Sequence, residues 1–192
     1  MPVPQRIAIT GASGLSGTAL VGHLKSEGHT VQRLVRRAPV SADEVQWDPQ
    51  TGFVDLEPLR GVDAIIHLAG VGVGDKRWNK KYKSEILNSR LLGTTAIANA
   101  VAELKPQVFI SSSAIGWYGE SGNRAVVETD RAGDDFLAAV CREWEAAADL
   151  AGDIRTVKIR TGLVLDPTGG ALGKMLPLFR LGLGGKMGNG KQ

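Results

Sequence analysis

The sequence predicts an α/β protein with a doubly wound parallel sheet, and three observations support this fold class. Short β-branched, apolar runs alternate with segments of helical apolar spacing from residue 6 to about residue 161. Several of these runs are almost continuously apolar, which is typical of parallel strands buried on both faces. A glycine-rich turn joins the first run to the first helical segment. Such alternation gives right-handed crossovers, with helices on both faces of one sheet.

The first third of the chain predicts a strand, helix and strand in succession. Residues 6–10 (RIAIT) form a β-branched run, and residues 15–24 place apolar side chains at helical spacing. After the break at Gly28, residues 30–35 alternate in the manner of a second strand. Residues 62–68 (VDAIIHL) then predict a third strand, which stops at Ala69 and Gly70.

The pattern continues through two further helices. Residues 84–104 predict a long helix that Pro106 closes, and residues 108–112 (VFISS) predict the next strand. Residues 134–151 predict a helix entered through Asp134 and Asp135, and residues 156–160 (TVKIR) predict a further strand.

The character of the sequence changes near Gly162. The remainder is rich in glycine and contains one helix candidate, residues 171–183, with Pro177 near its middle. We therefore expect a dinucleotide-binding domain over residues 1–165. Residues 166–192 are expected to begin a second lobe.

Composition narrows the classes of function. The chain has 192 residues, of which 43% are hydrophobic and 22% charged, with a net charge of +3. These values are ordinary for a globular protein, and the dispersed basic residues predict no nucleic-acid surface. Cys141 is the single cysteine, which excludes an internal disulfide and suits a reducing compartment. With no apolar run of membrane-spanning length and no secretory leader, the expected location is the cytoplasm, without membrane association.

The strongest local signal is the TGASGLSG loop at residues 10–17, which follows a strand and opens a helix. Gly11 would allow the tight turn, Gly14 the approach of a pyrophosphate, and Gly17 the close packing of helix on strand. The helix N-terminus would face the phosphates. We therefore expect cofactor contacts from Gly11, Ser13, Gly14, Leu15, Ser16 and Gly17. The alternative is a glycine-rich turn that binds no ligand.

Two arginines favour a particular cofactor. Rossmann domains that bind NAD usually carry an acidic residue about 20 positions beyond the loop, where this chain has Arg36 and Arg37. A guanidinium at that point can bind a 2′-phosphate, so the sequence predicts NADP(H) in preference to NAD(H). The alternative is a pair of solvated surface arginines.

Together the motifs resemble those of a known family. The segments TGASGLSG, DAIIHLAG, SSSAIGWYG and IRTG resemble motifs of the extended short-chain dehydrogenase/reductases. RWNKKYKSEILNSRLLGT, DDFLAAVCREWEAAA and MLPLFRLGLGG are similar to its atypical subgroup of nucleoside-diphosphate-sugar epimerase-like proteins, also called NAD-dependent epimerase/dehydratase-like. The resemblance covers essentially the whole chain.

The resemblance implies roles for further residues. Leu68, Ala69 and Gly70 match the segment that lies along the cofactor ribose. Ser111, in the strand that carries the active-site serine, is also expected to contact the cofactor. Ser113 is the residue expected to hydrogen-bond the substrate oxygen. The alternative is a serine that satisfies backbone groups at a strand end.

One departure concerns catalysis. The family's Tyr-x-x-x-Lys pair is absent, because the corresponding helix reads FLAAVCREWE from residue 136. Tyr118 is the nearby phenol that could substitute as catalyst or instead form a wall of the substrate pocket, and Lys158 is a strand lysine that could supply charge. Arg90 could bind an anion or cap a polar network. The histidines are not spaced as metal ligands, so no metal site is expected.

Two functions follow from these signals. The first is an NADP(H)-dependent epimerase or oxidoreductase that acts on a small polar substrate, a nucleotide sugar being one candidate. The second is a cofactor-binding sensor or regulatory module without catalysis. The resemblance also implies more chain beyond the glycine-rich segment than Gln192 allows, so we expect an incomplete substrate lobe. Apolar surface near residues 175–183 would then favour a homodimer.

Overall fold

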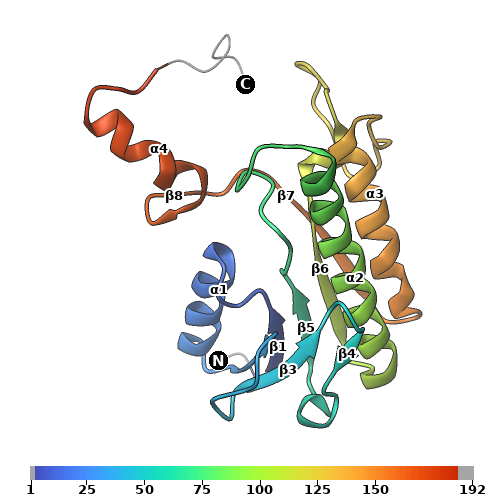
Figure 1. Cartoon of the computed structure of the whole chain (residues 1–192). Coiled ribbons are helices and arrows are strands. Elements are labelled where there is room, and N and C mark those ends of the chain that lie inside the picture. The colour runs from blue at the N-terminus through green and yellow to red at the C-terminus, as the bar shows by residue number, and fades with distance from the viewer. Residues whose placement is uncertain (1–2, 186–192) are drawn as a thin grey trace. The chain divides into compact units, whose positions relative to one another are not determined.

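The computed structural model describes residues 3–185 of the chain (Figure 1). The described residues form two compact units, residues 3–161 and residues 162–185. The first unit contains a seven-stranded sheet in the order β4-β3-β2-β1-β5-β6-β7. Its strands are β1 (Arg6–Thr10), β2 (Thr30–Val35), β3 (Glu44–Asp48), β4 (Phe53–Val54), β5 (Ala64–His67), β6 (Val108–Ala114) and β7 (Thr156–Thr161). Its helices are α1 (Leu15–Ser26), α2 (Lys80–Leu104) and α3 (Phe136–Ala148), with short 3-10 turns η1 (Glu57–Leu59), η2 (Ile115–Tyr118) and η3 (Asp149–Ala151).

Strand pairing confirms the doubly wound α/β fold. Every pairing in this sheet is parallel except that of β3 with β4, which is antiparallel. Strand order reverses beside β1, whose Ile7 pairs with Val31 on one side and Ala64 on the other. In open α/β sheets such a reversal opens a crevice at the carboxyl ends of the strands, where ligands bind.

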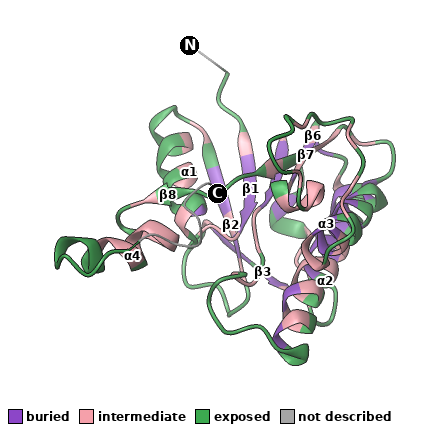
Figure 2. Cartoon of the chain, turned by 90° about the horizontal axis from the view of Figure 1, so that it is seen from above, coloured by how far each residue is buried: buried purple, intermediate pink, exposed green. Residues whose placement is uncertain are grey.

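Helices cover both faces of the sheet. On one face α1 packs Leu20, Val21 and Leu24 against buried strand residues that include Ile7 and Ile9. On the other face α2 and α3 lie side by side (Figure 1), and the core there includes Phe109, Ile65 and Ile97. Figure 2 shows buried residues, in purple, on the central strands and on α2 and α3. Each central strand is therefore buried on both sides, which explains its continuous apolar sequence.

The structure differs from the predicted elements mainly at their ends. Helix α2 begins at Lys80, four residues before the predicted start, because the side chain of Asn79 accepts a hydrogen bond from the Tyr82 amide at 2.8 Å. Helix α3 begins after Asp135, which caps it by accepting from the Ala138 amide, and it ends at Ala148 rather than at residue 151. Strands β3 and β4 were not predicted. In β3 the apolar Val45 and Trp47 alternate with the polar Gln46.

The second unit contains β8 (Leu165–Asp166) and α4 (Gly170–Arg180). Pro177 lies inside α4, as expected, and the helix ends at Arg180 rather than at residue 183. The division between the units falls after Thr161, and the assignment of a cofactor domain and a substrate lobe to these parts stays a prediction.

Candidate cofactor groove and reaction centre

The glycine loop between β1 and α1 has no room for side chains at its first and last glycines. Gly11 has a φ of 69°, and a Cβ there would lie 2.8 Å from the carbonyl carbon of Leu68. A Cβ at Gly17 would lie 2.1 Å from the carbonyl oxygen of Gly11. Gly14 donates to Gly11 O at 3.0 Å and forms the N-cap of α1 without a side-chain cap. The first amides of α1 are therefore left for an anion.

Thr10 and His67 shape the opposite wall of this loop. The Thr10 hydroxyl oxygen accepts from the amides of Leu68 and Ala69 at 3.1 and 3.3 Å, and lies 2.7 Å from His67 Nδ1. Burial lowers the pKa of His67 to about 3, so the imidazole is neutral. The Thr10 hydroxyl therefore donates a hydrogen bond to His67 Nδ1 while it accepts from the two amides. This network fixes the backbone of residues 68–69.

A groove of about 1170 Å³ joins the predicted cofactor segments. It runs from the glycine loop past the end of β2 to the segment after β5, along the carboxyl ends of β1, β2 and β5. The predicted cofactor residues that line it are Gly11, Ser13, Gly14, Arg36, Arg37, Leu68, Ala69 and Gly70. Leu15, Ser16 and Gly17 form the first turn of α1 and do not line the groove. Ser111 is buried within β6 and does not line it either. The structure thus brings eight of the twelve predicted cofactor residues together.

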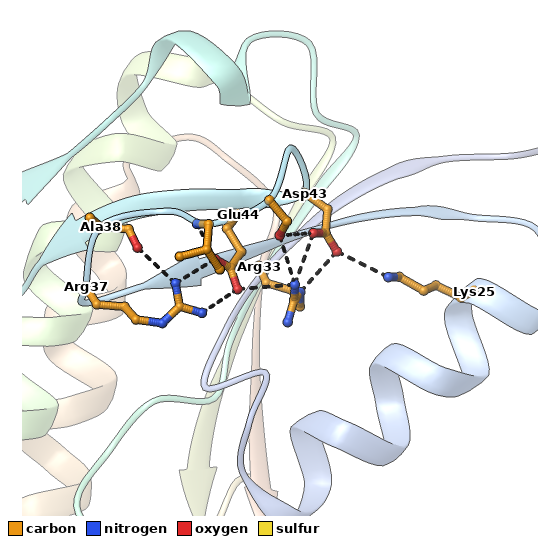
Figure 3. A network of polar contacts seen from close by, with 8 residues as sticks. Lys25, Arg33, Arg37, Ala38, Asp43 and Glu44 are labelled. Carbon is orange, nitrogen blue, oxygen red and sulfur yellow. Dashed lines mark hydrogen bonds and ion pairs between the residues drawn. The ribbon is translucent and has the colours of Figure 1, made fainter.

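The two arginines at the end of β2 have different surroundings, and Figure 3 shows those of Arg37. Arg37 donates to both carboxylate oxygens of Glu44, at 2.7 and 2.6 Å, and to the carbonyl of Ala38. Glu44 lies on β3, and its carboxylate also contacts Arg33 at 3.2 Å. The hydrogen bonds from Arg37 and the Val40 amide lower the pKa of Glu44 to about 2, so this carboxylate is ionised.

Arg36 stands apart from this ion-pair network. Its side chain is exposed and lines the groove, and within residues 3–185 no hydrogen bond or ion pair holds its guanidinium. Glu44 is already occupied by two arginines and so cannot serve as a free acceptor for ribose hydroxyls. With Arg36 available and the Glu44 carboxylate occupied, this end of the groove suits a 2′-phosphate better than a pair of ribose hydroxyls.

The predicted catalytic serine lies in a buried polar cluster. Ser113, at the end of β6, is 3% exposed and donates to Glu145 Oε1 at 2.6 Å. Arg160 on β7 pairs with the same carboxylate in a two-pronged contact, Nε to Oε1 at 2.8 Å and Nη2 to Oε2 at 3.0 Å. Burial raises the pKa of Glu145, but the hydrogen bonds from Arg160 and Ser113 outweigh it and the pKa is lowered. An ionised carboxylate accepts only, so the Ser113 proton points at Glu145.

Tyr118, the second predicted catalytic residue, belongs to the same cluster. Arg160 Nη1 donates to the Tyr118 hydroxyl at 3.1 Å and to the carbonyl of Glu128 at 3.0 Å. The guanidinium also stacks 3.9 Å from the centre of the Trp117 ring. Tyr118 lines a separate, partly open cavity of about 320 Å³ together with residues of the loop over residues 120–135.

Two other candidates have structural partners instead. Lys158 forms an ion pair with Asp149 at 2.6 Å and does not contact Tyr118. Arg90 donates to the carbonyls of Val71 and Ile86 and stacks on Trp144, which fits the capping of a polar network.

Sequence reasoning missed Glu145 and Arg160, the charged centre of this cluster. A signal was present, because Glu145 falls on the apolar face of α3 between the buried Trp144 and Ala147. An acidic residue at such a position needs a buried cation as its partner.

Residues 3–185 lack two features that would point to other classes of function. No cluster of three or more histidine, cysteine, aspartate or glutamate side chains suited to a metal ion occurs there. No helix in that part of the chain combines the length and the apolar character needed to cross a membrane.

Comparison with known proteins identifies the family. Residues 7–137 match the NAD dependent epimerase/dehydratase family. The chain belongs to this family. An epimerase family protein of Mycobacterium leprae is 43% identical over 189 residues, which cover 97% of this chain and 61% of that protein. The chain therefore spans about three fifths of the length of the curated relatives it matches.

Two solved structures of epimerase proteins share the fold. The human epimerase family protein SDR39U1, solved with NADPH, is 35% identical with a TM-score of 0.86, covering 97% of this chain and 63% of that chain. A nucleoside-diphosphate sugar epimerase from Corynebacterium glutamicum is 40% identical with a TM-score of 0.83, covering 97% of this chain and 39% of that chain. Both agree with the short-chain dehydrogenase/reductase resemblance of the sequence.

Proposed function

We propose that this epimerase-family chain binds NADP(H), in preference to NAD(H), in the groove between the glycine loop and residues 68–70. The observation that carries the proposal is the exposed Arg36 guanidinium, which lines the groove without a partner in the described chain while Arg37 is held by Glu44. The human relative solved with NADPH supports the same cofactor.

The residues of the groove fit such a cofactor. The close approach of Gly11 and Gly17 leaves the N-terminus of α1 bare for a pyrophosphate, and the fixed backbone of Leu68 and Ala69 forms the wall for a ribose. When bound, a nicotinamide cofactor supplies or accepts a hydride. Arg36 would bind the 2′-phosphate of the adenosine ribose.

We further propose that the protein is an epimerase or oxidoreductase for a small polar substrate, such as a nucleotide sugar. Ser113 and Tyr118, the predicted catalytic residues, are hydrogen-bonded to the two members of one ion pair, Ser113 to Glu145 and Tyr118 to Arg160, which supports a common role. The similar Corynebacterium glutamicum protein is described as a nucleoside-diphosphate sugar epimerase. A homodimer and a cytoplasmic location stay predictions.

A second candidate function is a cofactor-binding sensor without catalysis. It is favoured by α3, which lacks the family's tyrosine and lysine and instead presents Cys141 and Glu145 on its buried side. Burial raises the pKa of the Cys141 thiol, which keeps it protonated and unreactive. Ser113→Ala separates the two functions. If the protein is an enzyme, the variant should lose turnover while its cofactor affinity stays the same. If the protein is a sensor, the substitution should have almost no effect on either quantity.

The cofactor proposal is tested by calorimetric titration of the protein with NADPH and NADH. We expect tighter binding of NADPH, and a loss of about tenfold or more in NADPH affinity on Arg36→Ala with NADH affinity unchanged, since one charge-assisted contact to the 2′-phosphate is removed. Arg155→Ala, which removes an exposed arginine outside the groove, is the matched control. Equal affinities for the two cofactors would refute the preference, and no binding of either would refute the function.

A further inference from the structure

Arg160 is the hub of the buried cluster at the carboxyl ends of β6 and β7. It is the register neighbour of Ser113, so the two side chains lie on the same face of the sheet. Its guanidinium makes four contacts as a donor, two to Glu145, one to the Tyr118 hydroxyl and one to the Glu128 carbonyl. With its side chain only 15% exposed and the Trp117 ring stacked against it, this cation is held in one position.

Hydrogen-bond polarity fixes what the two hydroxyls of the cluster can do. Ser113 gives its proton to Glu145, so its oxygen is left only to accept. Arg160 can only donate, so Tyr118 must accept from it and keeps its own proton for another acceptor. One acceptor and one donor are thereby presented by the same charged pair.

We propose that Arg160 takes the place of the missing lysine of the Tyr-x-x-x-Lys pair, holding the Tyr118 phenol in position and leaving its proton free for a substrate oxygen. Glu145 is a positioning residue that fixes Arg160 and orients the Ser113 hydroxyl. This inference rests on the proposed enzymatic function and names the proton-transfer group of that site. It replaces Lys158, whose ammonium is bound to Asp149.

The proton transfer balances within these groups. The Tyr118 O–H bond breaks, its proton passes to an oxygen of the bound substrate, and the phenolate that remains keeps the hydrogen bond from Arg160. In the reverse direction a substrate hydroxyl returns the proton to the phenolate. The cavity of about 320 Å³ that Tyr118 lines provides space beside the phenol for such a group.

The test measures the reactivity of the phenol and needs neither substrate nor cofactor. Tetranitromethane nitrates tyrosine through its phenolate, and the chain has two tyrosines that mass spectrometry of peptides distinguishes. Tyr82, which is 2% exposed, serves as an internal reference. The variants are Arg160→Gln, Glu145→Gln, the double variant with both changes, and the control Arg155→Gln, with circular dichroism to confirm folding.

We expect Arg160→Gln to slow nitration of Tyr118 at about pH 8 by about fivefold or more, since the positive charge that donates to the phenol oxygen is lost. Glu145→Gln should not slow it, because the guanidinium remains and a nearby negative charge is removed. The double variant removes both charges and so leaves no unpaired buried charge, and it should also nitrate slowly. Arg155→Gln should match the wild-type protein.

A purely structural ion pair gives the opposite result. Breaking it from either side would loosen η2, expose Tyr118 and speed nitration in both single variants, which would overturn the inference. Unchanged nitration in the Arg160→Gln and double variants would overturn it too. Titration of the same variants with NADPH keeps the two proposals distinct, because Arg160 does not line the cofactor groove and its variants should bind NADPH as the wild-type protein does.

Discussion

Gly17 and Gly22 lie on the same helix, and replacing each by alanine should have opposite effects on stability. A Cβ at Gly17 would lie 2.1 Å from the Gly11 carbonyl oxygen and 2.9 Å from the Cα of Ala12, whereas a Cβ at Gly22 meets nothing within 4 Å. The neighbours of Gly17 are backbone atoms of the glycine loop, so α1 or the loop must move. Forcing an extra carbon into a packed site typically costs about 1–3 kcal/mol.

Gly17→Ala should therefore lower the free energy of unfolding by about 1–3 kcal/mol, partly offset by the better helix propensity of alanine. Gly22→Ala should raise it by up to about 1 kcal/mol, because only the propensity changes. Urea titration followed by circular dichroism measures both. Calorimetry should show NADPH affinity lost in Gly17→Ala and kept in Gly22→Ala, since the loop is displaced only in the former. Equal stabilities for the two variants would show that the loop yields without strain and would refute the reasoning.

Three further predictions follow from the polar networks. Glu44→Gln should destabilise the protein at neutral pH, because the lowered pKa of Glu44 contributes stability above the unfolded-state pKa of about 4.3. That contribution is lost as pH falls toward about 2, so the urea midpoints of the variant and the wild-type protein should converge over this range. Glu57→Gln, which removes one partner of an exposed ion pair, is the control. Burial lowers the pKa of His67 to about 3, so the folded protein keeps this imidazole neutral while the unfolded chain takes up a proton below about pH 6.5. The free energy of unfolding should therefore decrease as the pH is lowered, by about 2 kcal/mol at pH 5. His67→Gln should lack this decrease, and an equal decrease in that variant would contradict the assignment. Thr10→Val should cost about 1–3 kcal/mol in urea unfolding and speed hydrogen exchange at the amide of Ala69, which loses its acceptor. The Leu68 amide should change less, because it also donates to the backbone carbonyl of Thr10, and unaltered exchange at Ala69 would argue against the network.

Local chemistry explains what the sequence predicted well. The glycine loop was predicted because Gly11 needs a positive φ and Gly17 a bare backbone, requirements that only glycine meets and that depend on neighbours in the chain. The strands of the central sheet were predicted because burial on both faces demands a continuous apolar run, as in β5.

Long-range pairing explains what it missed. Strand β3 begins with Glu44, a residue that sequence rules place outside a sheet, and Glu44 is buried only because Arg37 and Arg33 reach its carboxylate. The cluster around Arg160 depends on the register of β6 with β7 and on a helix that places Glu145 opposite them. Neither partner can be identified until the strands are aligned in space.

The pairing of Arg33 with Glu44 makes the register of β3 against β2 a condition for the contact between Glu44 and Arg37. A slip of β3 by one residue would turn the carboxylate to the other face of the sheet, away from Arg37. Arg37 would then be released to compete with Arg36 for any anion in the groove. Cofactor choice in this chain would thus depend on strand register as well as on residue identity, and exchanging the two arginines for acidic residues would leave the register that places Glu44 unaltered.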